Sequence, residues 1–219
     1  MASPRPRSGI LEIEPYIGGK AEATGGKRTI KLSANESALG PSPKAVQAIQ
    51  DAASEGHRYP DGGAERLRSA IGKRFSLDPA RIVCGSGSDE LIHLLTLAYA
   101  GAGDEVLYSA HGFLMYQLSA LATGAMPVAA AERDLRTDVD ALLAAVTSHT
   151  RLVFIANPNN PTGSYITTDE LSRLHAGLPN DVVLVIDAAY AEYVHRDDYT
   201  TGLEPVSYTH LTLPTIYAV

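Results

Sequence analysis

The chain has 219 residues and 45% of them are hydrophobic, which is enough to bury the core of one large domain or two small ones. Its net charge of −7 argues against nucleic acid or an anionic membrane as a partner. No apolar run is long enough to span a membrane, residues 1–8 lack the apolar segment of a secretory signal, and the single cysteine excludes an intramolecular disulfide, so we expect a cytoplasmic protein.

The predicted elements begin after an irregular N-terminal arm, residues 1–40, which is rich in Gly, Pro and polar residues. Ser42 and Pro43 are typical of an N-cap followed by a first-turn proline, and they open a helix that we expect to end between residues 50 and 53. A second helix is predicted over 64–75, after a turn rich in Gly and Pro.

Strands and helices then alternate. The pattern predicts strands over residues 81–84, 105–109, 127–130, 152–156 and 182–187. It predicts helices over residues 89–100, 113–122, 138–146 and 168–175. We expect Ser88 to cap the first of these helices and Thr137 the third.

Short apolar strands separated by helices indicate right-handed crossovers, and therefore an α/β fold with a mostly parallel sheet covered by helices on both faces. Ligand sites in such sheets form outside the carboxyl ends of the strands. Three candidate segments are expected to meet at that edge: residues 85–90, residues 157–163 and the end of the strand 182–187.

The segment Gly85-Ser86-Gly87-Ser88-Asp89-Glu90 joins a predicted strand to a predicted helix. Glycines let the backbone approach a ligand closely, and the free N–H groups of a helix N-terminus attract anions. Ser88 and Asp89 are therefore candidate phosphate ligands, although the same residues would also suit a tight turn with an N-cap. The segment is not a Walker motif, because it lacks the Gly-Lys-Ser/Thr ending.

Asp187 ends an apolar run, where a carboxylate costs several kcal/mol unless it is paired or hydrogen-bonded. A cationic ring nitrogen would be a suitable partner, and capping of the next loop is the alternative. Asn160 and Tyr190 could each hydrogen-bond a phenolic oxygen. The alternatives are that Asn160 is only part of a turn and that Tyr190 only packs beneath the loop. Phe113 could stack on a flat ring or be part of the core. The histidines show no metal-ligand spacing, so we expect no metal.

In combination, these segments resemble the histidinol-phosphate aminotransferase family, within the class I and II aminotransferases that use pyridoxal 5′-phosphate (PLP). The similarity runs from about Pro15 to Glu204. The segments that carry it follow the order of the family: Pro15-Tyr16, Leu32-Ser33-Ala34-Asn35-Glu36-Ser37, Gly40-Pro41-Ser42-Pro43, Arg58-Tyr59-Pro60-Asp61, Gly85 to Glu90, Phe113-Leu114-Met115-Tyr116, Asn157 to Gly163 and Asp187-Ala188-Ala189-Tyr190.

The resemblance implies a fold-type I PLP-transferase large domain over residues 41–204, present only in part. It also implies a role for each matching coenzyme residue: phosphate binding for Ser88 and Asp89, ring stacking for Phe113, the phenolic oxygen for Asn160 and Tyr190, and the ring nitrogen for Asp187. Tyr59 would reach across a homodimer to the partner's coenzyme phosphate. Tyr16 and Asn35 would lie on the substrate side.

The implied reaction is transamination between histidinol phosphate and imidazole-acetol phosphate, with glutamate and 2-oxoglutarate, in histidine biosynthesis. It needs a lysine that forms a Schiff base with the coenzyme. The chain has no lysine beyond Lys73, so we expect no catalytic residue in this chain and no turnover. Alternatives are an aromatic-amino-acid aminotransferase or a phosphothreonine decarboxylase of the same fold, and a lysine-free PLP-fold protein that binds ligand without catalysis.

The chain departs from the family at several points, one of which is Ala188, where the family often has glutamate. Ser109-Ala110-His111-Gly112 replaces a more usual loop containing Pro-Thr before Phe113. Residues 206–215 resemble one reading frame of a transposase-type sequencing adapter, so we expect residues 205–219 to be a foreign tail on a truncated protein. The alternative is a genuine edge strand, since Val, Tyr, Thr and Ile favour strands.

Overall fold

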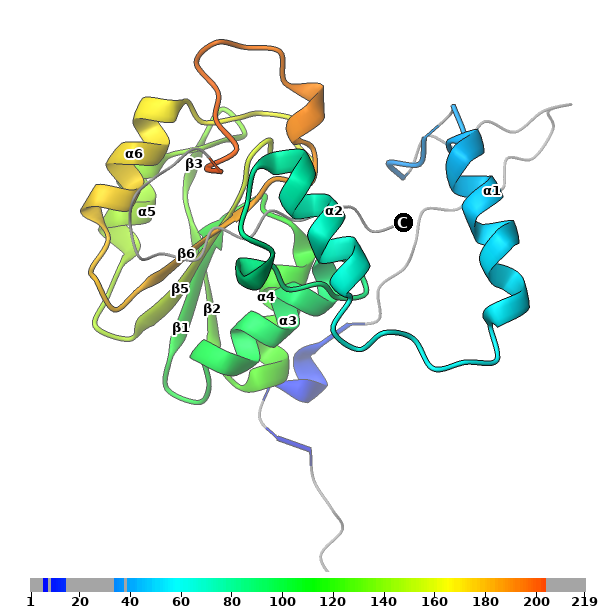
Figure 1. The fold of residues 1–219 in the computed structure, drawn as a ribbon. Helices are drawn as coiled ribbons and strands as arrows, with labels where there is room; N and C mark the ends of the chain where they lie inside the picture. Colours follow the sequence, from blue (N-terminus) through cyan, green and yellow to red (C-terminus); the bar gives the residue numbers. More distant parts are fainter. Residues whose placement is uncertain (1–5, 8, 15–33, 38, 204–219) are drawn as a thin grey trace, which may run out of the picture. The chain divides into compact units, whose positions relative to one another are not determined.

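The computed structural model describes residues 6–7, 9–14, 34–37 and 39–203 (Figure 1). They belong to two compact units, Met1–Ile13 with Arg68–Val219, and Glu14–Leu67. The predicted substrate residue Tyr16 and the predicted foreign tail, 205–219, lie outside the described residues.

The larger unit is built on a four-stranded sheet with the order β2-β1-β5-β6. All three ladders of this sheet are parallel, which confirms the predicted fold class. The strands are β1 (Glu105–Ser109), β2 (Met126–Ala130), β5 (Thr150–Ala156) and β6 (Val183–Asp187). The register places Ala156 opposite Asp187 at the carboxyl ends of β5 and β6.

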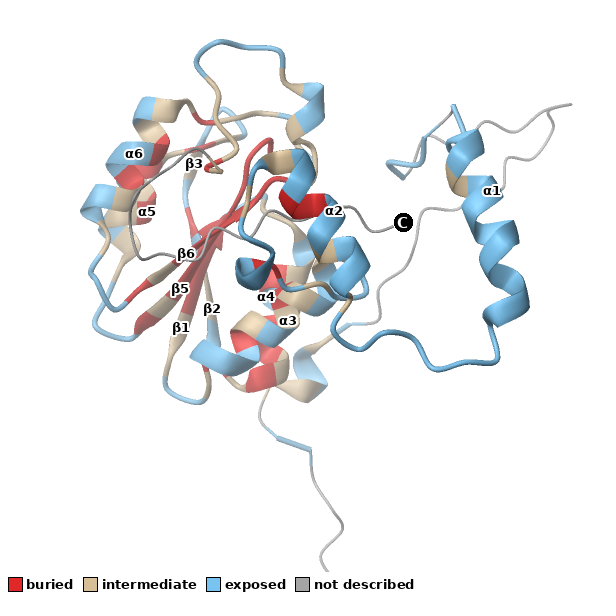
Figure 2. Cartoon of the chain, in the orientation of Figure 1, coloured by how far each residue is buried: buried red, intermediate tan, exposed pale blue. Residues whose placement is uncertain are grey.

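Alternate residues of the strands belong to two separate cores, one on each face of the sheet. Val153, Ile155 and Leu184 pack with α5 (Val139–Ala145) and α6 (Thr168–Gly177). Leu152, Phe154 and Val185 pack on the other face with α3 (Gly87–Tyr99) and α4 (Leu114–Thr123). Figure 2 shows the strands as the buried centre of this unit, with helices on either side. The sheet is therefore covered on both faces, as a continuous apolar strand requires.

Two helices begin at other N-cap residues than the ones predicted. Asp138, not Thr137, is the N-cap of α5, and its carboxylate accepts from the backbone N–H groups of Asp140 and Ala141. Ser86, not Ser88, is the N-cap of α3, so Ser88 lies inside the first turn. In both cases the helix begins at a different residue from the one predicted, and boundaries are the least certain part of a pattern-based assignment.

The predicted strand 81–84 is wrong. Pro79–Arg81 forms a short 3-10 helix, η3, capped by the Asp78 side chain. Residues 82–85 belong to no strand, and Val83 is 65% exposed. Apolar β-branched residues favour an extended chain, but a strand also needs a neighbour to pair with. Within the described part of the chain, β6 pairs only with β5 and β2 only with β1.

A short hairpin follows β2 that the sequence did not reveal. It consists of β3 (Glu132–Arg133) and β4 (Arg136–Thr137), which pair antiparallel. Asp134 and Leu135 form the turn with φ values of 52° and 59°. Two left-handed residues are the signature of a type I′ turn, but Asp-Leu lacks the glycine by which such turns are recognised in a sequence.

The smaller unit contains α1 (Pro43–Ala52) and η2 (Ala53–Glu55), and α2 (Glu65–Phe75) starts at its end. Pro43 lies in the first turn of α1, as predicted. None of the residues of α1 is buried (Figure 2). Near the start of the chain, η1 (Ile10–Glu12) belongs to the larger unit, and the Arg7 guanidinium donates to the Ala122 carbonyl of α4 at 2.7 Å. No helix among the described residues is long and apolar enough to cross a membrane.

Candidate functional site

Asp187 lies at the carboxyl end of β6 and is 6% exposed. Its Oδ2 accepts a hydrogen bond from the Tyr116 hydroxyl at 2.9 Å, and its Oδ1 accepts one from the Ala189 backbone N–H at 3.1 Å. Because a buried carboxylate is costly unless hydrogen-bonded, these donors stabilise the acid at the strand end. The interpretation of Asp187 as only a loop cap is incomplete, since a side chain from α4 also holds it.

Tyr116 is a functional candidate that sequence reasoning did not single out for a role. Its ring is fully buried and stacks on Phe154, with centroids 4.8 Å apart and planes 8° apart. The Phe113 ring contacts it edge to face at 5.9 Å. Burial and the negative charge of Asp187 raise the pKa of the Tyr116 phenol well above its ordinary value, so the hydroxyl remains a donor. Its position three residues after Phe113 in the helix predicted over 113–122 was the available signal.

Ser88 and Asp89 lie in the first turn of α3. Gly87 has a left-handed φ of 84°, which suits glycine, and the Ser86 backbone N–H donates to the Glu90 carboxylate at 2.5 Å. Burial, and secondly the charge of Asp187, raise the pKa of the Asp89 carboxyl. The two acids therefore lie close enough to repel each other. A cationic group beside Asp187 would relieve that repulsion, and the N-terminus of α3 offers partial positive charge for an anion.

The loop after β5 is held together by its own asparagines. The Asn157 side chain accepts from the Ile166 N–H at 2.9 Å and donates to the Ile166 carbonyl at 3.2 Å. The Asn159 amide donates to the Thr162 hydroxyl at 2.9 Å and to the His111 carbonyl at 3.1 Å. Asn157 and Asn159 thus build the loop and tie it to the loop after β1. Asn160, the predicted ligand, is half-buried within it.

Tyr190 follows β6 by three residues and stands at the start of η4 (Ala191–Tyr193). It is half-buried, and its ring lies 6.3 Å from that of Tyr193. The segment that continues from η4 returns to the site, because the Tyr199 hydroxyl donates to the Asn157 carbonyl at 2.7 Å. The sequence order alone could not show that this later segment supports the loop after β5.

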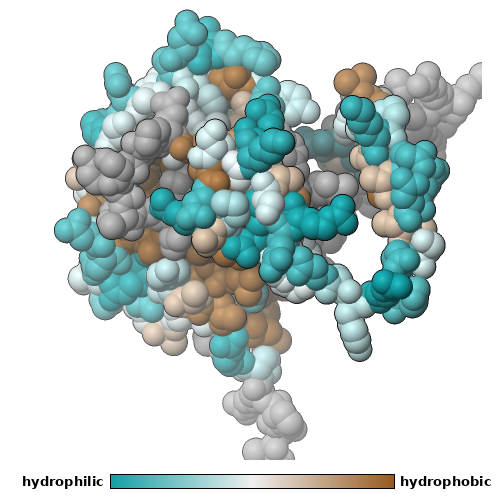
Figure 3. Space-filling view, viewed as in Figure 1, coloured by the Kyte–Doolittle hydropathy of each residue, from teal (hydrophilic) through white to brown (hydrophobic). Residues whose placement is uncertain are grey.

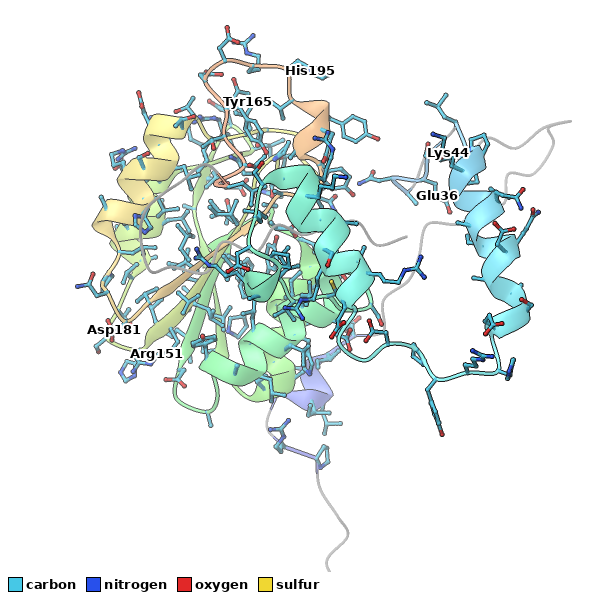
Figure 4. All side chains as sticks on the ribbon, in the orientation of Figure 1. Glu36, Lys44, Arg151, Tyr165, Asp181 and His195 are labelled. Atoms are coloured by element: carbon cyan, nitrogen blue, oxygen red, sulfur yellow. The ribbon has the colours of Figure 1, made fainter. Side chains whose placement is uncertain are left out.

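The two ends of the sheet differ in their chemistry. At the amino end, Arg151 of β5 pairs with Asp104 at 3.2 Å and with Asp181 at 3.4 Å, on the surface of the unit. Figure 4 shows Arg151 and Asp181 next to each other at this end, and Tyr165 at the opposite end, where Asp187 also lies. The buried carboxylate of Asp187 lies at the carboxyl end, where Tyr116 donates to it and Phe113 contacts Tyr116.

The remaining predicted residues lie in the smaller unit. Tyr59 and Asn35 are both exposed within it. No group of three His, Cys, Asp or Glu residues among the described positions could hold a metal ion. The larger unit carries the other predicted residues, Ser88, Asp89, Phe113, Asn160, Asp187 and Tyr190. Three of them are connected, because Phe113 contacts Tyr116, Tyr116 donates to Asp187, and the charge of Asp187 acts on Asp89.

Ligand sites of parallel α/β domains form outside the carboxyl ends of the strands. Here that edge carries a buried acid, an aromatic residue at a helix start and a helix N-terminus that suits an anion such as a phosphate. Residues 27–212 match the family model of aminotransferase class I and II, and the chain belongs to that family.

Several relatives are similar over most of this chain. Histidinol-phosphate aminotransferase from Rhodospirillum centenum is 63% identical over 202 residues, which is 92% of this chain and 56% of the relative. The enzyme of the same name from Paramagnetospirillum magneticum is 62% identical over 206 residues, 94% of this chain and 57% of the relative. The chain thus spans little more than half the length of these curated relatives.

Among solved structures, histidinol-phosphate aminotransferase from Sinorhizobium meliloti in complex with pyridoxal-5′-phosphate matches with a TM-score of 0.72 and 32% identity. The match covers 83% of this chain and 46% of that one. The resemblance inferred from the sequence is therefore confirmed at the level of family and fold.

Proposed function

We propose that the chain is the PLP-binding part of an aminotransferase that exchanges the amino group of histidinol phosphate with 2-oxoglutarate. The observation that carries the proposal is the buried carboxylate of Asp187, held at the end of β6 by Tyr116 and the Ala189 N–H. Relatives at 62–63% identity that are named histidinol-phosphate aminotransferase support the substrate.

The residues present fit the coenzyme. Asp187 would hold the ring nitrogen, where its negative charge favours the protonated form, and Phe113 would lie against the ring. The first turn of α3, with Ser88 and Asp89, would hold the phosphate through backbone N–H groups. Asn160 and Tyr190 would bind the phenolic oxygen. When bound, PLP supplies an electron sink for the carbanion that forms at the substrate Cα.

Transamination also needs a lysine to move the proton between the substrate and the coenzyme. No lysine follows Lys73 in this sequence, so the proposal for this chain is coenzyme binding without turnover. The longer protein would supply the lysine and would be a homodimer in which Tyr59 reaches the partner's coenzyme phosphate, with Asn35 and Tyr16 on the substrate side.

PLP binding to the 219-residue chain, measured by equilibrium dialysis, tests the proposal. We expect Asp187→Asn to raise the dissociation constant about tenfold, which corresponds to roughly 1.4 kcal/mol. Asp181→Asn is a matched control, because Asp181 precedes the same strand but lies at the opposite end, where it pairs with Arg151. Equal affinities for Asp187→Asn and the unmodified chain would contradict the proposed role of Asp187.

The substrate is tested separately in the longer protein that the proposal assumes. Glutamate should form from 2-oxoglutarate faster with histidinol phosphate as the amino donor than with an aromatic amino acid. Phosphothreonine should release no carbon dioxide. A preference for phenylalanine or tyrosine would replace the proposed substrate while it left the coenzyme site in place.

A further inference from the structure

The Glu132 carboxylate lies almost fully buried against the loop that follows β1, with its side chain 4% exposed. Its Oε1 accepts from the Ser109 hydroxyl at 2.5 Å and from the His111 backbone N–H at 2.9 Å. Its Oε2 lies 2.8 Å from His111 Nδ1. The three partner groups come from Ser109, the last residue of β1, and from His111 in the loop that follows. Because a buried carboxylate costs several kcal/mol when its oxygens are unsatisfied, the buried acid and this loop conformation depend on each other.

The direction of these hydrogen bonds makes Glu132 the acceptor. The Thr137 hydroxyl donates to Ser109 Oγ at 3.2 Å, so the single Ser109 proton is available for Glu132. Burial alone raises the pKa of the Glu132 carboxyl, but the hydrogen bonds from Ser109 and His111 outweigh it and lower that pKa below its ordinary value. Glu132 is therefore ionised at neutral pH, when its two oxygens can accept all three bonds.

The same loop is held from its other side. The Asn159 amide, in the loop after β5, donates to the His111 carbonyl at 3.1 Å. Within the loop, the Gly112 N–H donates to the Ser109 carbonyl at 2.7 Å. A Cβ at position 112 would lie 2.8 Å from that carbonyl oxygen, so the tight turn requires glycine. The backbone of residues 109–112 is thus restrained from both sides.

Phe113 follows this turn directly and is the N-cap residue of α4. Its ring contacts Tyr116, which in turn donates to Asp187. We propose that Glu132 is a positioning residue that holds the turn 109–112 in the conformation that presents Phe113 to the coenzyme ring beside Asp187. This rests on the proposed function, because it assigns Phe113 to the coenzyme, but the restraint of the turn can be tested without any ligand.

The first test is amide hydrogen exchange on the unliganded chain, resolved by NMR. In Glu132→Gln, the amides of His111 and Gly112 should exchange about tenfold faster. The substitution removes the charged acceptor of the His111 N–H, so the turn opens more often. Glu105→Gln is the matched control: Glu105 begins the same strand, and its carboxylate also accepts from the Thr147 and Thr150 hydroxyls, at 2.6 and 3.2 Å. It should leave the exchange of both loop amides unchanged.

The second test is PLP affinity of the same variants by equilibrium dialysis. Glu132→Gln should raise the dissociation constant about tenfold, roughly 1.4 kcal/mol, while Glu105→Gln should not change it. If exchange accelerates but the affinity stays the same, Glu132 restrains the turn 109–112 without positioning Phe113 for the coenzyme, and the inference is overturned. If neither changes, the restraint itself is disproved.

The two proposals fail in different ways. If the unmodified chain binds no PLP, the proposed function of the chain fails, and with it the link to the coenzyme, while the exchange data still decide whether Glu132 restrains the turn. If PLP binds and Asp187→Asn weakens it but Glu132→Gln does not, only the positioning role is lost. Should Glu132→Gln not fold, His111→Ala removes one of the three bonds, and it must shift both readouts in the same direction by a smaller factor.

Discussion

Two segments were each expected to follow a strand and to carry coenzyme ligands, and they differ in how many side-chain hydrogen bonds hold them. The connection from β5 to α6, residues 157–167, is held by paired asparagine, threonine and glutamate side chains. The segment before α3, residues 82–86, has one such bond, from the Ser86 N–H to Glu90, within the described part of the chain. The first follows a strand paired on both edges, whereas the second belongs to no ladder.

The difference shows that a loop can be restrained by hydrogen bonds from its own side chains or can lack most of them. In the connection after β5, side chains satisfy the backbone, so the loop carries its own restraint. In the segment before α3, Val83 is mostly exposed and belongs to no strand. Leu94, Leu97 and Tyr99 of the adjacent helix α3 are also exposed. Figure 3 shows hydrophobic residues gathered on part of the surface of this unit. We therefore expect substitutions to be costly on the first side and nearly neutral on the second.

The largest effect is expected for Asn157→Ala, which should lower the free energy of unfolding by about 3 kcal/mol, since both the N–H and the carbonyl of buried Ile166 lose their partner. Guanidinium unfolding monitored by circular dichroism measures this. Asn180→Ala, the same substitution at an exposed turn before β6, should stay within about 0.5 kcal/mol. Similar losses for the two variants would mean that the loop is not self-supporting.

Tyr116→Phe should cost about 2 kcal/mol at pH 7, because it keeps the ring and removes only the bond to the buried Asp187 carboxylate. The pKa of Tyr116 is raised above its ordinary 10.0 in the folded protein. The folded state thus holds this proton more tightly, and the stability from it is present below pH 10 and is lost as pH rises above it. The gap between the two proteins should therefore narrow above pH 10.

Tyr108→Phe provides the comparison for that variant, since its ring lies 6.4 Å from Tyr116 in the same core. At pH 7 it should cost less than Tyr116→Phe in the same guanidinium titration. An equal cost for the two would show that the bond to Asp187 contributes nothing to the folded state.

Glu170→Gln should have a smaller effect, about 1 kcal/mol at pH 7. The Glu170 carboxylate accepts hydrogen bonds from both terminal nitrogens of Arg136 and forms the capping box with Thr167. Because the Arg136 side chain is 39% exposed, solvent screens this ion pair. The hydrogen bonds from Arg136 lower the pKa of Glu170 from 4.5 to about 2. A lowered pKa means that this stability is present above pH 4.5 and is lost as pH falls toward 2.

Urea unfolding at pH 7 and pH 3 measures that pH dependence. Asp140→Asn is the control, because the Asp140 side chain is 77% exposed and its pair with Arg173 lies at the surface. It should change stability by less than about 0.5 kcal/mol at either pH. A difference between Glu170→Gln and the unmodified chain that does not shrink at pH 3 would contradict the role of the ionised pair.

The sequence predicted what depends on local pattern and missed what depends on distant partners. The run 152–156 and the acid at 187 were found because apolar strands and a strand-end carboxylate are visible in one segment each. Tyr116 and Glu132 were not, because their partners, Asp187 and the loop 109–112, are 71 and 21 to 23 residues away. The strand predicted over 81–84 failed for the same reason, since hydropathy indicates an extended chain but not its neighbour.

The smallest effect gives the most direct test of this comparison. Val83→Ala should cost less than about 0.5 kcal/mol, because Val83 is 65% exposed and little apolar area is lost. Val153→Ala makes the same change in β5, where the side chain is 0% exposed, and should cost about 2 to 3 kcal/mol through the lost burial and the cavity it leaves. Guanidinium unfolding compares them. If Val83→Ala costs as much as Val153→Ala, the segment before α3 is packed as tightly as a central strand, and the contrast between the two sides of the site fails.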